Sequence, residues 1–297
     1  TRSSGKTSLL GASLLEIMRK YRIISVEDTL ELNTDEMRKI GYNIQALKVR
    51  SALTKGGTEV PADEGIRTSL RMGDSSLIVG EIRSQEAFAL FEAMRIGALA
   101  NVVAGTIHGD SPYGVFDRVV NDLKVPRTSF KAIDVIIVSN PVKSSDGLHK
   151  WRRVMQVTEV RKHWEKDPLR EQGFVDIFTY NPKKDSLDVS QDLANGEIEV
   201  LKKIAGNVRE WAGDWDAIID NINLRADIKQ KLIDYSDKAN MPDLLEANFV
   251  VDANDMFHII SDKVKDEVGS LESKRILFEF DDWLKGKIRE RKFHQSG

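Results

Sequence analysis

Six consecutive residues near the start of the chain have the types and order of a phosphate-binding loop. The segment SSGKTS corresponds to the end of the motif G-x-x-x-x-G-K-[ST], in which backbone N–H groups and a helix N-terminus bind phosphate. The lysine would reach the β- and γ-phosphates of a nucleotide, and the threonine hydroxyl would bind Mg²⁺. We therefore predict a nucleotide site formed by Ser3, Ser4, Gly5, Lys6, Thr7 and Ser8. The glycine and the strand that should precede this loop are missing, which we interpret as a cut in the chain.

Three strand-like runs end in polar residues that can do chemistry. RIISV ends in Glu27 and Asp28, SLIVG ends in Glu81, and NVVAGTI ends in His108. The ligand crevice of an open parallel sheet lies at the carboxyl ends of its strands, and the loop above would lie at the same edge. Each residue alone is more simply explained as a helix cap or a solvated loop residue. Their convergence with Lys6 and Thr7 favours a functional site.

The two glutamates have natural roles in nucleotide hydrolysis. One would orient and deprotonate the attacking water, and the other would hold Mg²⁺ directly or through its waters. Arginines would neutralise the charge that develops on the γ-phosphoryl group. Arg67 and Arg71 have the i, i+4 spacing of one helical face, and Arg83 follows Glu81 closely. Each arginine could equally be an ordinary surface charge.

The elements around these residues predict an α/β fold. We expect helices at 6–21, 63–73, 85–96 and from 112, and between them strands that are continuously apolar, including DVIIV (134–138). Helices between such strands indicate a mainly parallel sheet covered on both faces. Strands at 152–160 and 174–181 would add antiparallel at its edge. Helices follow, with 196–205, 225–237 and 274–291 the clearest. We predict a core at 1–190 and a C-terminal helical region at 191–297.

Composition excludes several classes of site and partner. The 297 residues contain no cysteine, which rules out disulfides, thiolate zinc sites and cysteine nucleophiles. A formal net charge of -3 gives no reason to expect nucleic acid as the main partner. The basic stretch KWRRVMQVTEVRKH (150–163) is more typical of a strand with a solvated edge than of a binding patch. No apolar run is long enough to span a bilayer.

These motifs resemble the type II/IV secretion ATPases, which power type IV pilus, archaellum and type II or IV secretion machinery. SSGKTS is similar to their Walker A loop, IISVEDTLEL to their Asp box, LIVGEIRSQEAFALFEAMRIG to their Walker B box, and AGTIHGDSPYGVFDRV to their His box. DGLHKWRRVMQVTEV resembles the archaeal branch of the family. The resemblance covers roughly residues 1–180. It implies a RecA-like P-loop NTPase core.

The resemblance also implies roles and partners. Glu27 would be the general base, Glu81 the Walker B acid that acts on the metal, and His108 a sensor of the γ-phosphate. The implied protein is a homo-hexameric, Mg²⁺-dependent ATP-hydrolysing motor that docks on a polytopic platform protein at the cytoplasmic face of the cytoplasmic membrane.

Two departures from the family pattern matter. The chain has LRMGDSS where relatives commonly have LRMRPDR, which leaves open which arginine serves as the finger. The N-terminal domain that relatives carry upstream supplies part of their nucleotide pocket, so this chain alone is expected to bind nucleotide weakly or not to hydrolyse it.

The alternatives are another oligomeric RecA-like ATPase, such as a helicase or DNA-packaging motor, and a nucleotide-binding assembly module without turnover. A small-molecule kinase is favoured least, because no segment suggests a second substrate pocket or a lid.

Overall fold

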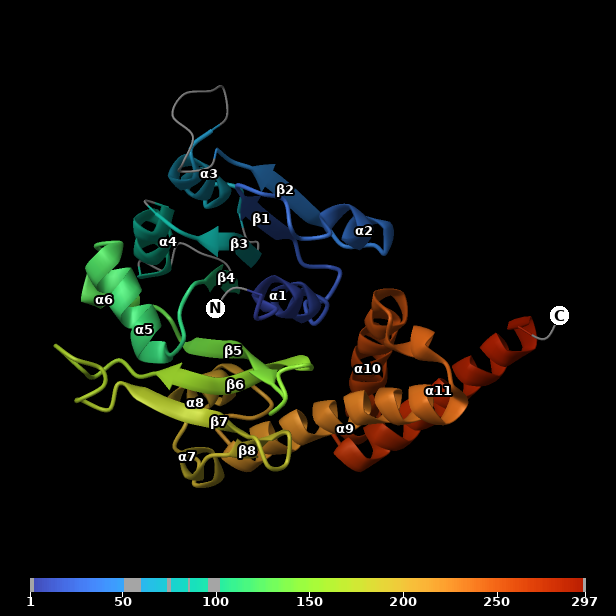
Figure 1. Cartoon of the computed structure of the whole chain (residues 1–297). Helices are drawn as coiled ribbons and strands as arrows, with labels where there is room; N and C mark the ends of the chain where they lie inside the picture. The colour runs from blue at the N-terminus through green and yellow to red at the C-terminus, as the bar shows by residue number, and fades with distance from the viewer. Residues whose placement is uncertain (1–2, 51–59, 74–75, 85, 96–101, 296–297) are drawn as a thin grey trace. The chain divides into compact units, whose positions relative to one another are not determined.

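The computed structural model describes residues 3–50, 60–73, 76–84, 86–95 and 102–295, with the backbone alone at residues 93 and 293–295. The chain forms two compact units, residues 1–200 and 201–297. The first is α/β and the second is helical (Figure 1).

A parallel sheet of four strands carries the predicted strand ends of the first unit. Its strands are β1 (Ile23–Glu27), β2 (Ile44–Lys48), β3 (Ser76–Ile82) and β4 (Val103–Ile107), in the order β2-β1-β3-β4. Every residue of β1 is buried, as its unalternating apolar sequence predicts for a central strand. The pairing of β3 with β4 is irregular between Val79 and Ile82, where Glu81 lies. The predicted strands that end in Glu27, Glu81 and His108 are confirmed.

Short helices accompany this sheet. They are α1 (Lys6–Leu14), α2 (Thr34–Lys39), α3 (Ala62–Ser69), α4 (Glu86–Arg95), α5 (Pro112–Asp117), which continues as a π-helical turn over Arg118–Asp122, and α6 (Arg127–Phe130). Helix α1 is shorter than the predicted 6–21. The backbone N–H groups of residues 15–17 bond to carbonyls three residues back, and the Tyr42 hydroxyl donates to the carbonyl oxygen of Leu15 (2.9 Å). These contacts satisfy the end of the helix and stop it early.

The second sheet corrects our expectation of antiparallel strands added to the edge of the first. Strands β5 (Val135–Lys143), β6 (Lys150–Val160), β7 (Phe174–Asn181) and β8 (Ser186–Val189) form a separate antiparallel sheet in the order β5-β6-β7-β8. DVIIV was expected in the parallel sheet but begins β5. Its burial alternates, with Val135 and Ile137 exposed and Ile136 and Val138 buried, as in a one-faced antiparallel strand. The four-residue connection between β7 and β8 (182–185) also permits only antiparallel pairing of those two strands.

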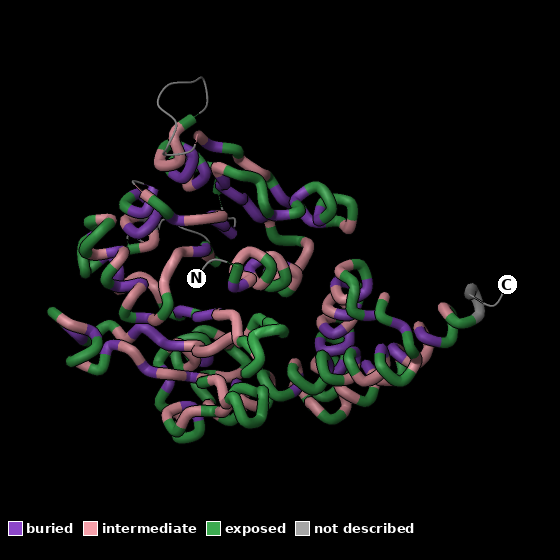
Figure 2. The backbone as a smooth tube through the Cα atoms, viewed as in Figure 1, coloured by how far each residue is buried: buried purple, intermediate pink, exposed green. Residues whose placement is uncertain are grey.

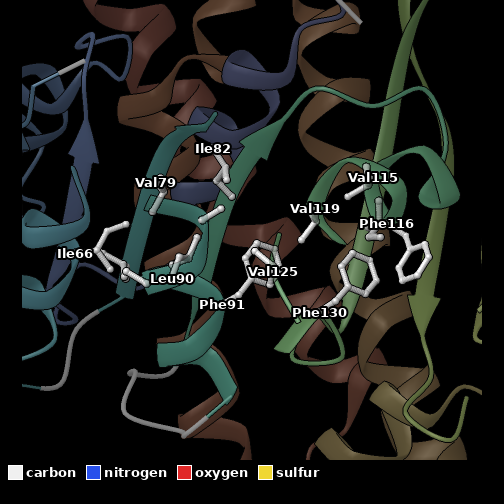
Figure 3. Close-up of a cluster of buried hydrophobic side chains, with 14 of the residues drawn as sticks. Ile66, Val79, Ile82, Leu90, Phe91, Val115, Phe116, Val119, Val125 and Phe130 are labelled. Carbon is white, nitrogen blue, oxygen red and sulfur yellow. The ribbon is translucent and has the colours of Figure 1, made fainter. Parts of the chain in front are cut away.

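One hydrophobic core joins both sheets of the first unit. Figure 3 shows side chains of β3, α3, α4, α5 and the following turn gathered in this cluster, which also includes Ile136, Val138 and Val160 from the antiparallel sheet. Phe116 meets Phe130 and Trp164 edge-on, with ring centroids 5.2 and 5.5 Å apart. Figure 2 shows buried residues in the strands of both sheets, and the packing of their side chains in one core holds the two sheets together beside the site.

The second unit is built from long amphipathic helices. After α7 (Gln191–Ala194), which belongs to the first unit, come α8 (Glu199–Asn207), α9 (Trp215–Ala239), a 3₁₀ turn (Pro242–Leu245), α10 (Ala247–Val268) and α11 (Ser273–Gln295). The three predicted C-terminal helices are confirmed by α8, α9 and α11. The buried faces of α9, α10 and α11 meet in a core that includes Leu232, Phe257 and Phe280. No helix in the described part of the chain is both long and apolar enough to cross a membrane.

Candidate functional site

The predicted phosphate-binding loop lies at the N-terminus of α1. Gly5 immediately precedes the helix with φ of 87° and ψ of 20°, a left-handed conformation that glycine adopts without strain. The helix begins at Lys6, so its first N–H groups and positive dipole end point into the loop region. A phosphate-binding loop requires this placement of glycine directly before a helix.

A cavity of about 350 Å³ opens beside this loop. Its volume lies within the range of small-molecule sites, roughly 300–1,000 Å³. It is lined by Ser3, Ser4, Gly5, Lys6, Thr7, Ser8, Glu31, Glu81, Arg83, Thr106, His108 and Arg152. All six predicted loop residues, together with Glu81, Arg83 and His108, therefore meet at one cavity.

Glu81 lies at the centre of the charged groups at the strand ends. One of its carboxylate oxygens accepts a hydrogen bond from the Arg83 guanidinium, which also lies 3.5 Å from Oδ2 of Asp28. The other oxygen, Oε1, lies 2.9 Å from Nε2 of His108. That contact lacks hydrogen-bond geometry, so Oε1 is buried with no hydrogen-bonding partner among the described residues. A buried carboxylate oxygen in this state is suited to a cation or a water.

The surroundings of Glu81 and His108 keep the first charged and the second neutral. Burial acts to raise the pKa of Glu81, but the hydrogen bond and charge of Arg83, with the charges of His108 and Lys6, outweigh it and lower the pKa. Burial and then the charge of Lys6 lower the pKa of His108, against the opposing effect of Glu81. The lowered pKa favours the neutral imidazole at pH 7.

Glu27 lies next to the cavity but does not line it. Its side chain is only 2% exposed, and Oε2 accepts hydrogen bonds from the backbone N–H groups of Glu31 (2.9 Å) and Leu32 (3.1 Å). It packs against Gly80, where an added Cβ would lie 2.7 Å from Cγ of Glu27. Oε1 has no hydrogen-bonding partner in the described part of the chain. The carboxylate thus orders the turn after β1, while its general-base role stays a prediction.

Glu31 lines the cavity instead, although its sequence did not mark it as a candidate. The Thr7 hydroxyl donates a hydrogen bond to its Oε2 at 2.8 Å, which ties the turn after β1 to the phosphate-binding loop. The signal that could have found Glu31 is its position four residues after Glu27 in the same EDTLE segment. A residue in a turn has no periodicity that predicts its direction.

The three predicted arginines lie in different places. Arg83 lines the cavity, whereas Arg67 and Arg71 are exposed and do not. Helix α3 ends at Ser69, so Arg71 lies in the following turn, and the i, i+4 argument for a shared helical face is wrong. A finger role for either residue at a neighbouring subunit stays a prediction.

The antiparallel sheet also contacts the loop. Nε of Arg152 in β6 donates a hydrogen bond to the carbonyl oxygen of Ser3 (3.0 Å). The Ser139 hydroxyl in β5 donates a hydrogen bond to the Ser4 hydroxyl (3.5 Å). We expected the arginine-rich stretch at 150–163 to be a strand with a solvated edge. It does form a strand, but Arg152 lies at the cavity while Arg153 binds Asp185.

Magnesium fits the oxygen donors at this cavity. The Thr7 hydroxyl and the Glu81 carboxylate are the hard oxygen ligands that Mg²⁺ prefers, and Oε1 of Glu81 has no hydrogen bond to give up. The described residues contain no group of three or more His, Asp or Glu side chains placed to hold a metal. An ion here would therefore depend on phosphate and water for its remaining ligands, which is usual for Mg²⁺.

Comparison with known proteins gives a family match over more than half of the chain and relatives that cover up to about three quarters of it. A family model described as "Type II/IV secretion system protein" matches residues 1–165. MJ1287 of Methanocaldococcus jannaschii is 30% identical over 233 residues, which cover 77% of this chain and 78% of that protein. VirB11 of Agrobacterium fabrum is 26% identical over 57% of this chain, and the type IV secretion system protein PtlH of Bordetella pertussis is 28% identical over 56%. The matches cover 47% of VirB11 and 48% of PtlH.

Among solved structures, the chain is similar to the VirB11 ATPase of Brucella suis in complex with sulphate. The TM-score is 0.42 at 22% identity, and the match covers 53% of this chain and 46% of that one.

Proposed function

The chain belongs to the type II/IV secretion system protein family, and on that premise we propose that it binds and hydrolyses ATP to drive a secretion, pilus or archaellum machine. One observation carries the proposal: the loop with Lys6 and Thr7 lines the same cavity as Glu81 and His108, which come from two separate strands.

The phosphate chain of ATP would lie over the N-terminus of α1. Backbone N–H groups from Gly5 onward and the helix dipole favour the negative charge, and Lys6 neutralises the β- and γ-phosphates. Arg83 is already bonded to Glu81 and close to Asp28, so it first orders those carboxylates. Neutral His108 can donate a hydrogen bond to the γ-phosphate from its ring N–H without adding charge.

Thr7 and Glu81 would hold Mg²⁺, which supplies charge neutralisation between the phosphates when bound. A second carboxylate must then accept a proton from the attacking water. Glu31 lines the cavity and accepts a hydrogen bond from Thr7. Glu27 accepts a hydrogen bond from the backbone N–H of Glu31. We assign the proton-accepting role to Glu31 and the positioning role to Glu27, in place of Glu27 acting alone.

The assembly follows from the family rather than from this chain's geometry. We propose a homo-hexamer at the cytoplasmic face of the membrane, docked on a polytopic platform protein, with no nucleic acid partner. The curated relative PtlH is a type IV secretion system protein, which supports a role beside a secretion apparatus. An arginine from a neighbouring subunit would complete the pocket, and Arg67 and Arg71 are exposed enough to serve.

The test is ATP binding and turnover in Mg²⁺ by the full-length protein and four glutamate variants. Glu81→Gln and Glu31→Gln should each lower turnover by about 100-fold or more, the usual contribution of a general base or metal ligand. Glu36→Gln is the matched control, because that glutamate is exposed on α2 and outside the cavity. Glu27→Gln should lower turnover together with stability, whereas Glu31→Gln should leave stability unchanged.

Each outcome has a distinct meaning. Equal turnover in Glu81→Gln, Glu31→Gln and the unchanged chain would refute the assignment. Tight ATP binding without turnover would favour a nucleotide-binding assembly module. Stimulation of turnover by single-stranded DNA or RNA would favour a helicase or packaging motor.

A further inference from the structure

Arg152 reaches the phosphate-binding loop from the antiparallel sheet. Its Nε donates to the carbonyl oxygen of Ser3 at 3.0 Å. Its Cδ lies 3.1 Å from the point that a Cβ on Gly5 would occupy, so the side chain lies against the loop where glycine has no side chain. The same residue lines the cavity that holds Lys6, Glu81 and His108.

The charge of Arg152 is not balanced by a carboxylate in the described part of the chain. Its neighbour Arg153 makes two hydrogen bonds to Asp185, at 2.6 and 2.7 Å. Of the two carboxylates that line the cavity, Glu31 accepts a hydrogen bond from Thr7 and Glu81 from Arg83, and neither pairs with Arg152. The hydrogen bond to Ser3 uses Nε alone, which leaves the two terminal nitrogens of the guanidinium for another acceptor.

We infer that Arg152 binds the phosphate chain of the nucleotide, so that Lys6 and Arg152 hold it from two different sides of the cavity. This inference rests on the proposed function, because it assigns a further residue to the same site. A planar guanidinium matches phosphate oxygens in a bidentate manner that a lysine cannot reproduce. The bond to Ser3 sets the guanidinium beside the loop before any ligand arrives, which lowers the entropy lost on binding.

The competing explanation is that Arg152 only braces the loop through the Ser3 carbonyl. Glutamine separates the two explanations, because its Nε2 lies as many bonds from the backbone as Nε of arginine. Arg152→Gln therefore keeps a donor for Ser3 and removes the guanidinium charge. Arg153→Gln is the matched control, since it removes the same charge from the adjacent position, which lies outside the cavity.

The experiment is a fluorescence titration of the chain with a labelled ADP in EDTA, so that no metal or turnover is involved. Arg152→Gln and Arg152→Ala should both bind ADP about 10- to 100-fold more weakly, the effect expected for hydrogen bonds to a charged group. Arg153→Gln should bind within about twofold of the unchanged chain, since exposed charges outside the site contribute little. Circular dichroism of each variant checks that the fold is retained.

Failure of this inference can be told apart from failure of the proposed function. If Arg152→Gln binds ADP as the unchanged chain does while Lys6→Ala does not bind, Arg152 is only a brace and the inference is wrong. If Arg153→Gln weakens binding as much as Arg152→Gln, the effect is general electrostatics and the inference is equally wrong. If Lys6→Ala binds ADP as well as the unchanged chain, the nucleotide site itself is wrong.

Discussion

Replacing Gly80 with alanine should disturb the site through a single methyl group. Gly80 lies in β3 immediately before Glu81, and an added Cβ would lie 2.7 Å from Cγ and 3.3 Å from Oε2 of Glu27. Real Cβ contacts are not that close, so the buried Glu27 side chain must move. Its Oε2 accepts hydrogen bonds from the N–H groups of Glu31 and Leu32, so the turn that carries Glu31 moves with it.

The size of the effect follows from two opposing contributions. Forcing an extra methyl group into a packed interior costs about 1–3 kcal/mol. Replacing a glycine within a strand recovers about 0.5–1 kcal/mol, because alanine loses less backbone entropy on folding. We therefore expect Gly80→Ala to lower the free energy of unfolding of the first unit by about 1–2 kcal/mol.

Gly11→Ala is the matched control for this prediction. Gly11 lies inside α1, and an added Cβ would meet only Cδ2 of Leu32 at 3.9 Å, an ordinary contact. This variant should gain up to about 1 kcal/mol of stability. Denaturant unfolding gives the stabilities, and hydrogen exchange at the amides of Glu31 and Leu32 reports the turn directly. A Gly80→Ala protein as stable as Gly11→Ala, with unchanged exchange at these two amides, would refute the reasoning.

Two further predictions concern titration. Lys6→Ala should raise the pKa of His108, because the Lys6 charge lowers that pKa, and Glu81→Gln should lower it further, because Glu81 opposes that effect. An NMR titration of the His108 ring, assigned with His108→Asn, measures both shifts. A shift in the opposite direction would contradict these electrostatic interactions. Hydrogen bonds from the N–H groups of Asp167, Glu165 and Lys166 lower the pKa of Glu171 from 4.5 to about 2. The stabilising contribution of Glu171 is therefore complete above about pH 4.5 and is lost as the pH falls towards 2. In acid unfolding experiments, the free energy of unfolding of Glu171→Gln should fall less steeply with pH over that range than that of the unchanged chain. Equal steepness in the two proteins would contradict this prediction.

The parallel sheet was predictable because its strands carry a local signal. RIISV and SLIVG are short, unalternating and β-branched, so both their type and the edge at which they end follow from sequence. Strand β2 (Ile44–Lys48) was missed because its sequence IQALK has no such pattern. DVIIV has the same composition as the parallel strands, and only its pairing with β6 sets it in the other sheet.

The site was predictable where a residue ends a strand or begins a helix, and not elsewhere. Lys6, Glu81 and His108 come directly from such positions. Arg152 does not, because period-two alternation says that Arg152 and Arg153 face opposite sides of β6 without saying which side meets the loop. That choice depends on a contact between residues 3 and 152, far apart in the chain.

Two contacts join Ser3 and Ser4 of the loop to the antiparallel sheet, so they are sensitive to any movement of that sheet relative to the loop. The bond from Arg152 to Ser3 is 3.0 Å long, and the contact from Ser139 to Ser4 is already 3.5 Å. A hydrogen bond loses most of its strength when its heavy atoms separate by about 0.5 Å more, so a sub-ångström slide of β6 past α1 releases the Ser3 carbonyl. The distance between Nε of Arg152 and the Ser3 oxygen therefore reports whether the antiparallel sheet has moved relative to the phosphate-binding loop.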